Sequence, residues 1–149
     1  MDSLFNNDAK QVILNRINKL TPDTKGQWGK MDVAQMLAHC GQIMEVAIAD
    51  KKLPRTFSGR FVGPFVKQFL FNDSTFPKNS PTDPNFKIVD QKDFKTEKER
   101  LLNLVNRFQE KGEQGLTKHK HPFFGSLTNN QWGMASYKHL SYHLNQFGV

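Results

Sequence analysis

Three histidines are the residues of this chain whose type and spacing best fit metal chemistry. His139 and His143 lie four positions apart in YKHLSYHLNQF, a segment with helical periodicity. Because side chains at i and i+4 stand one turn apart on the same helix face, these two imidazoles can bind one ion. His39 lies in DVAQMLAHCGQIMEVAIAD, a second helical stretch, and can supply a third ligand. Three neutral nitrogens leave coordination positions open, which is typical of a reactive metal centre rather than a closed structural one.

A role without metal is the alternative for these histidines. A lone histidine on an apolar helix face is more often a hydrogen-bonded core residue than a ligand. Two buried imidazoles without partners would cost roughly 1–3 kcal/mol each, so both need an ion, a water or a protein acceptor. The pattern H-x-x-x-H is a weak signal by itself. Leu140 stands where the metalloprotease pattern has its glutamate, which argues against a peptidase.

Other groups capable of chemistry fit a structural role better. His119 and His121 lie in KHKHP, where neighbouring lysines repel a cation, so the sequence predicts solvated loop histidines. Cys40 is the single cysteine, which excludes an intramolecular disulfide and a cysteine-based zinc cage, and it is expected to pack as a small apolar residue. Glu45 and Asp50 form no paired-carboxylate pattern, so the sequence names no general base.

Length and composition predict one globular domain spanning residues 1–149. Hydrophobic residues make up 37% of the chain, and no apolar run approaches the roughly 20 residues that span a bilayer. The start, MDSLFNNDAKQV, lacks the features of a secretory signal, so a cytoplasmic location without membrane association is expected. The net charge is +7, but no helix-turn-helix, basic zipper or aromatic RNA-binding motif accompanies it. Nucleic-acid binding is therefore disfavoured.

The elements that must position the histidines are predicted to be helices. Apolar periodicity predicts long helices over residues 4–19, 33 to about 50, 96 to about 111, and 128–147. The predicted capping boxes are Asp32 with Gln35, Thr96 with Glu99, and Thr128 with Gln131. Gly63 and Pro64 interrupt the apolar stretch 59–71, which predicts a short kinked helix. Residues 72–85 contain three prolines and predict a long loop, a candidate lid. The predicted fold class is all-α.

The last predicted helix carries little charge. From Pro122 to Val149 the only charged side chain is Lys138, whereas a solvent-facing helix normally carries charges on its outer side. We therefore expect this helix to be covered by the other helices and by a second subunit, in a homodimer. Its predicted inward stripe consists of Trp132, Ala135 or Ser136, His139, His143 and Gln146.

A basic cluster lies after the second predicted helix and comprises Lys51, Lys52, Arg55, Arg60 and Lys67. Such a cluster suits an anionic ligand, although plain solubility explains it equally well. The sequence does not tell whether the cluster faces the histidines.

Two segments resemble a known family. WGKMDVAQMLAHC in the first half and HPFFGSLTNNQWGMASYKHLSYHLNQFGV at the end are similar to a small uncharacterised family of the DinB-like superfamily, and the resemblance extends from about Leu20 onward. It implies a four-helix bundle with a long crossover connection, here with a short extra helix. It also implies that one histidine of the second helix and two of the fourth bind a divalent metal ion. These correspond to His39, His139 and His143, the residues that the spacing selects.

The resemblance implies an enzyme that activates a small molecule on its metal. Characterised relatives bind the sulfur of a low-molecular-weight thiol, transfer it to electrophiles or use it in isomerisation, and often form dimers. Imidazole ligands suit zinc or nickel. We therefore expect a metal-dependent thiol S-transferase, or a hydrolase that uses metal-bound water, acting on a small-molecule substrate. The alternative is a non-catalytic binding or interaction protein in which the metal is a structural clamp between two helices.

Overall fold

The computed structural model describes residues 2–72 and 74–149, and within them the chain forms helices joined by loops, without any β-strand. The long helices are α1 (Asn7–Lys19), α2 (Val33–Ala47), α5 (Phe94–Lys111) and α6 (Asn129–Gln146). The short ones are α3 (Phe57–Phe61) and α4 (Gly63–Leu70), with the 3-10 turns η1 (Pro84–Phe86) and η2 (Glu113–Gly115). The all-α prediction is confirmed, and so is the kinked helix, which breaks at Val62 just before Gly63 and Pro64.

Side chains at the helix starts explain where the helices that carry the histidines begin. Both Asp32 and Thr128 accept from the backbone N–H three residues later, and Gln35 and Gln131 return the bond, so these two predicted capping boxes are confirmed. The third predicted box is wrong. Asp93 caps α5 instead, accepting from the Thr96 N–H at 2.8 Å and the Thr96 hydroxyl at 2.6 Å, because its carboxylate is the stronger acceptor three residues upstream.

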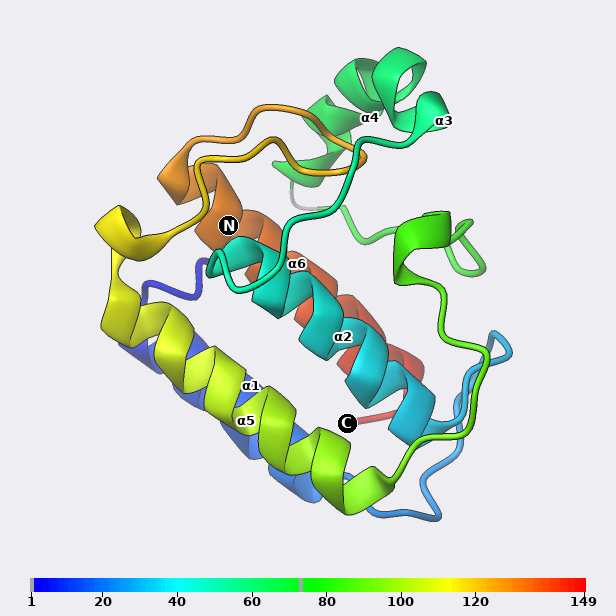
Figure 1. Cartoon of the computed structure of the whole chain (residues 1–149). Coiled ribbons are helices and arrows are strands. Elements are labelled where there is room, and N and C mark those ends of the chain that lie inside the picture. Colours follow the sequence, from blue (N-terminus) through cyan, green and yellow to red (C-terminus); the bar gives the residue numbers. More distant parts are fainter. Residues whose placement is uncertain (1, 73) are drawn as a thin grey trace.

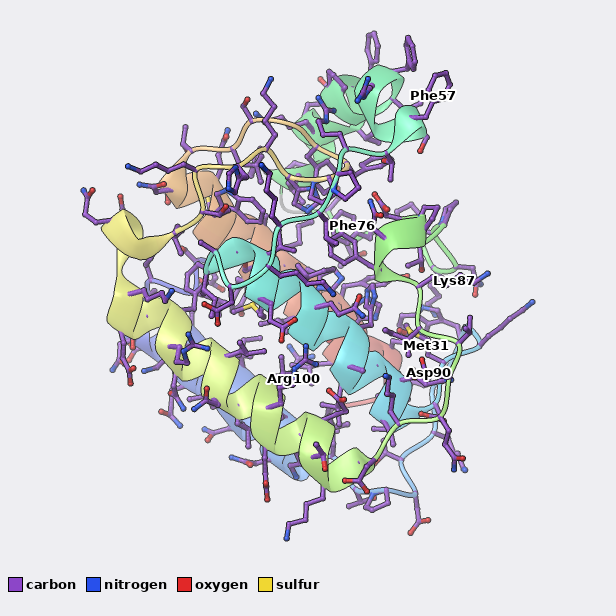
Figure 2. The ribbon with its side chains drawn as sticks, viewed as in Figure 1. Met31, Phe57, Phe76, Lys87, Asp90 and Arg100 are labelled. Carbon is purple, nitrogen blue, oxygen red and sulfur yellow. The ribbon has the colours of Figure 1, made fainter. Side chains whose placement is uncertain are left out.

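The four long helices lie alongside one another, and each contacts two of the others (Figure 1). Helix α2 packs against α5 and α6, and α1 packs against the same two helices from the other side. Leu37 from α2, Ile17 from α1, Val105 from α5 and Leu144 from α6 are buried in the shared core. Arg100 joins α5 to α2 through Glu45 at 2.7 Å, and Figure 2 shows it on α5 beside α2. This packing fixes α2 and α6 as antiparallel neighbours (Figure 1).

Helices α3 and α4 stand at one end of the molecule, away from the long helices (Figure 1). Phe57, Phe61 and Phe65 are largely exposed there, and Figure 2 shows Phe57 pointing outward. Among the described residues, no helix is long and apolar enough to cross a membrane.

The loop that follows α4 covers part of the outer face of α6. Lys138 donates to the Asn72 carbonyl at 2.9 Å, and the Tyr142 hydroxyl donates to the Pro77 carbonyl at 3.1 Å. The ring of Phe76 also packs edge-on against Tyr142. The long loop over residues 72–85 is confirmed for its described residues, while Asp73 lies outside them. The low charge of α6 thus has an explanation within one chain, and the homodimer stays a prediction.

Candidate metal centre

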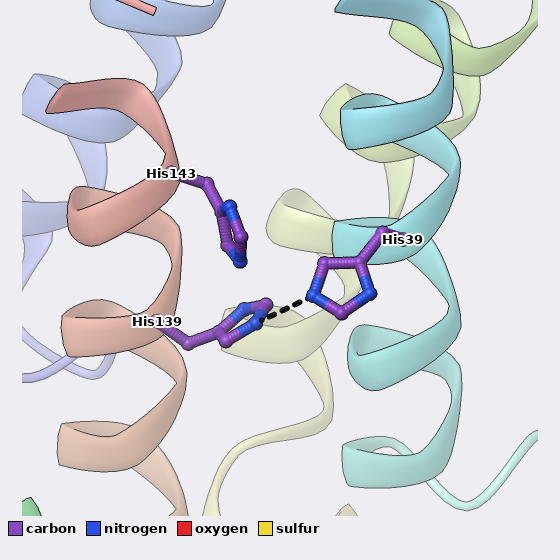
Figure 3. Close-up of side chains that lie close together, drawn as sticks. All are labelled: His39, His139 and His143. Atoms are coloured by element: carbon purple, nitrogen blue, oxygen red, sulfur yellow. Dashed lines mark hydrogen bonds between the residues drawn. The ribbon is translucent and has the colours of Figure 1, made fainter. Parts of the chain in front are cut away.

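Helices α2 and α6 bring the three predicted histidines together. His39 projects from α2, and His139 and His143 project from α6 into the same space (Figure 3). One ring nitrogen of each lies within 4.8 Å of the other two. The Nε2 atoms of His39 and His139 are 3.0 Å apart, close to the roughly 3.3 Å that separates two imidazole nitrogens on one tetrahedral zinc ion. Small side-chain shifts therefore suffice to place all three nitrogens on one cation.

The backbone of η1 orients His39. The Phe86 carbonyl oxygen lies 2.8 Å from His39 Nδ1, and a carbonyl can only accept, so Nδ1 carries the proton of the neutral ring. The lone pair of His39 is thereby on Nε2, the atom that faces His139. Metal-binding histidines commonly have such an outer partner, which fixes the tautomer and the ring plane.

Gln146 does the same for His143. Its Oε1 atom accepts from His143 Nδ1 at 2.8 Å, and its Nε2 atom donates to the Trp28 carbonyl at 2.7 Å. The amide is thus held between α6 and the loop before α2. Gly29 allows this loop to approach, because its φ of +83° favours glycine and a Cβ atom there would lie 2.5 Å from the Gln146 amide nitrogen. The Nε2 lone pair of His143 is therefore available to a cation.

All three histidines are held in the neutral form that binds metals. Burial lowers the pKa of His39 below its ordinary value, against the opposing effect of the hydrogen bond to Phe86. Burial and then the neighbouring His39 lower the pKa of His143 to about 3. The pKa of His139 is also well below its ordinary value because of burial first and then the neighbouring histidines. Near pH 7 each ring therefore offers a lone pair.

The donor set fits a divalent cation with open positions. His39 and His143 are buried, while part of the His139 surface is accessible to solvent. Among the described residues, the group that can hold a metal contains three imidazoles and no carboxylate or thiolate. Such ligands would leave the ion's charge uncompensated and further coordination positions available. Cys40 is buried with a raised pKa because of burial, as expected for a packed residue.

His121 is not the solvated loop residue that the sequence predicts, whereas His119 is exposed as predicted. His121 Nδ1 accepts from the backbone N–H groups of Phe123 and Phe124, both at 3.1 Å, which closes the loop around the ring. The ring centroid lies 5.2 Å from that of Trp132. Burial and the nearby Arg55 lower the pKa of His121 to about 3. The neighbouring Lys118 and Lys120 are exposed, so the lysines of KHKHP do not keep His121 in solvent.

Part of the basic cluster also turns inward. Arg55 Nη2 donates to the Gly59 carbonyl at 2.7 Å and to the Phe123 carbonyl at 3.3 Å, in the loop that holds His121. Lys67 likewise donates to the Ser126 carbonyl. Arg60, in contrast, is exposed. The cluster is therefore divided: Arg55 and Lys67 bind backbone carbonyls of the segment that follows His121, whereas Arg60 is exposed.

Four buried side-chain atoms of the described residues have no hydrogen-bond partner: Gln42 Oε1, Arg55 Nε, Trp132 Nε1 and Ser136 Oγ. An unsatisfied buried polar atom costs about 1–3 kcal/mol, so the four together would cost about 4–12 kcal/mol. That is comparable to the whole stability of a typical domain, about 5–15 kcal/mol. Such atoms need a water or a ligand as partner.

Sequence reasoning missed the groups that surround the three histidines. Gln146 had a usable signal, because it lies three residues after His143 on the predicted inward stripe. The Phe86 carbonyl had none, since a backbone acceptor in a loop carries no side-chain signature. Arg55 and His121 were recognised as a basic residue and a loop histidine, but their inward orientation depends on how the loop of residues 121–125 packs against α3.

Comparison with known proteins gives a family without an assigned activity. The sequence matches the family model described as "Protein of unknown function (DUF1569)" over residues 3–148. No curated protein matches the sequence, and no solved structure does. Any function must therefore be argued from the site itself.

Proposed function

The chain belongs to the DUF1569 family of proteins of unknown function, and from its histidine site we propose that it is a metal-dependent enzyme with a DinB-like four-helix bundle. His39, His139 and His143 would hold one divalent ion, zinc or nickel. The reaction we favour is activation of a low-molecular-weight thiol for transfer to an electrophile, with hydrolysis by bound water as the second candidate. The observation that carries the proposal is the convergence of three neutral imidazole nitrogens within 4.8 Å.

The donor set supports activation of a nucleophile. A divalent cation bound only by imidazoles keeps its full charge and lowers the pKa of a bound thiol or water toward neutrality. The protein's own contribution would be orientation. The Phe86 carbonyl and the Gln146 amide hold two of the imidazoles in one tautomer, so no proton has to leave His39 or His143 when an ion binds.

The accessibility of His139 favours an enzyme over a structural clamp. A clamp needs a closed site, usually with four protein ligands. Here the described residues offer three ligands, and one of them retains contact with solvent. A substrate atom would therefore have a route to an open coordination position.

Elemental analysis of purified protein tests the metal. We expect about one divalent ion per chain in the wild type and in His119→Ala, whose histidine is exposed. We expect a large loss of metal in His139→Ala, because two imidazoles bind far more weakly than three. Equal metal content in wild type and His139→Ala would defeat the metal assignment, and loss in both variants alike would show that the effect is not specific to the site.

The reaction needs a second assay. The metal-loaded protein would be incubated with bacillithiol, glutathione or cysteine and an electrophilic acceptor such as a chlorodinitrobenzene, with His139→Ala as the control. Turnover that depends on both the thiol and His139 would support the transferase. Metal binding without turnover for any thiol, but with ester or amide hydrolysis, would support the hydrolase, and absence of both would favour the clamp.

A further inference from the structure

The unpartnered buried atoms lie on one side of the histidines. Figure 1 shows that α2 and α6 run antiparallel, so moving forward from His39 and backward from His139 leads in the same direction. Gln42 lies three residues after His39, and Ser136 lies three residues before His139. Both are therefore one helical turn from the site, on the same side of it. Trp132 lies one further turn along α6 in that direction.

The loop with Arg55 meets α6 at this same end. His121 packs its ring against Trp132, and the Phe123 N–H binds His121 Nδ1. Arg55 in turn binds the Phe123 carbonyl, which places its guanidinium next to this group. His121 also packs against Phe86, whose carbonyl orients His39. Contacts thus connect Arg55 to Trp132 through Phe123 and His121, and the same chain of contacts continues from His121 through Phe86 to His39.

The two chain segments that contain Arg55, Trp132 and Ser136 carry no acidic side chain. The chain has no Asp or Glu from Lys51 to Asn72, and none from Gln114 to Val149. Glu45 on α2 is paired with Arg100 of α5. Asp83 accepts from the hydroxyl of Thr56, the residue after Arg55. The hydrogen-bond partners of Arg55 among the described residues are carbonyl oxygens, and its Nε atom has none.

We propose that Arg55, Trp132 and Ser136 form a subsite for a carboxylate group of the substrate that binds at the metal. This inference rests on the proposed function, which it refines to small thiols or related molecules that carry an acid. The guanidinium Nε–H and the indole N–H are donors only, and the serine hydroxyl can donate as well. A carboxylate accepts several such bonds, and the guanidinium supplies the opposite charge. Gln42 Oε1 is an acceptor and suits an N–H or O–H group beside that carboxylate.

Matched pairs of acids and alcohols test the subsite on the cobalt(II)-loaded protein. Mercaptoacetate, 3-mercaptopropionate and 4-mercaptobutyrate would each be compared with the mercaptoalcohol of equal chain length, by the thiolate-to-cobalt absorption band. We expect at least one acid to bind ten-fold or more tightly than its alcohol. Equal affinities within two-fold for all three pairs would overturn the proposal.

Variants separate recognition from general charge effects. Arg55→Gln should reduce the preference for the acid to near one and leave the affinity for the alcohol unchanged, whereas Arg55→Lys should keep part of the preference. Arg60→Gln is the matched control, because it removes the same charge from an exposed position of the same cluster. Ser136→Ala should weaken acid binding five-fold or more without any change in charge, and it carries the test if Arg55→Gln does not fold. An equal effect of Arg60→Gln and Arg55→Gln would refute a specific subsite.

A second measurement does not depend on metal. In chelator-treated protein, the indole N–H resonance of Trp132, assigned by comparison with Trp28→Phe, would be followed by NMR during titration with propionate and with propan-1-ol. We expect propionate alone to shift it, and Arg55→Gln to abolish the shift. A protein that binds no cobalt but shows this shift would disprove the proposed function and keep the subsite. A protein that binds cobalt but shows neither the shift nor a preference for acids would disprove the subsite alone.

Discussion

Acidification should destabilise the metal-free protein through its buried histidines. Burial lowers the pKa of both His121 and His143 to about 3 in the folded chain, against an ordinary value of about 6.5. A group whose pKa is lower in the folded state favours folding while it is neutral. Its contribution is therefore complete above about pH 6.5 and is lost as the pH falls below that value, because the unfolded chain then binds protons that the folded chain does not.

The size of the effect follows from these pKa values. At pH 5 the unfolded chain has protonated nearly all of each histidine, while the folded chain has kept both neutral. The cost is about 2 kcal/mol per histidine, or about 4 kcal/mol for His121 and His143 together. This free-energy cost hardly depends on the pKa of the histidine in the folded chain as long as that pKa stays near 3 to 4. Aspartates with lowered pKa, such as Asp50, add their own loss only at lower pH, near and below about 4.

Urea unfolding followed by circular dichroism at pH 8, 7, 6 and 5, with a chelator present, measures this loss. We expect the free energy of unfolding to fall by about 4 kcal/mol or more from pH 8 to pH 5, with His39 and His139 adding to it. His121→Gln should reduce the fall by about 2 kcal/mol, whereas His119→Gln, at an exposed position, should leave it unchanged. A loss below about 1 kcal/mol over this range would refute the argument that these rings are buried and neutral.

Three further outcomes follow from single contacts. Gln146→Leu should weaken metal binding about 10–100-fold in a chelator competition, because His143 loses the acceptor that fixes its tautomer; Gln11→Leu, on the exposed face of α1, should have no effect. Gly29→Ala should destabilise the fold by about 1–3 kcal/mol in urea unfolding, since its φ is +83° and the new methyl group meets the Gln146 amide; an unchanged midpoint would contradict that contact. Thr128→Ala should cost about 1 kcal/mol by loss of the α6 cap, and Thr128→Ser should restore it.

The helices and the three histidines could be predicted from the sequence because residue types and spacings within short segments determine where these helices begin and which side chains share a face. Asp32 and Thr128 are caps with a partner three residues later, and apolar periodicity defines the helices that follow. The i, i+4 spacing of His139 and His143 places both rings on one face whatever the rest of the chain does. The predicted cap at Thr96 is wrong because Asp93, three residues earlier, starts the helix first: its carboxylate accepts from the Thr96 N–H and from the Thr96 hydroxyl.

The residues that surround the three histidines could not be predicted from the sequence in the same way. His121 is buried because a loop folds over it and donates two backbone N–H groups, and neither the burial nor the donors follow from the letters KHKHP. Arg55 turns inward because the Gly59 carbonyl of α3 and the Phe123 carbonyl of the loop 121–125 accept from its guanidinium. These arrangements depend on contacts between distant segments, which residue type and spacing do not specify.

The distance along the chain between His39 and His139 bears on when an ion can be acquired. The two residues are 100 positions apart, and His143 comes later still. At a translation rate of about 5–20 residues per second, a ribosome needs on the order of 5–20 s to proceed from the first to the second. A nascent chain therefore has one histidine of the three until α6 is synthesised. Metal loading of the proposed site would therefore follow the synthesis and packing of α6, and the helical core would assemble without help from the ion.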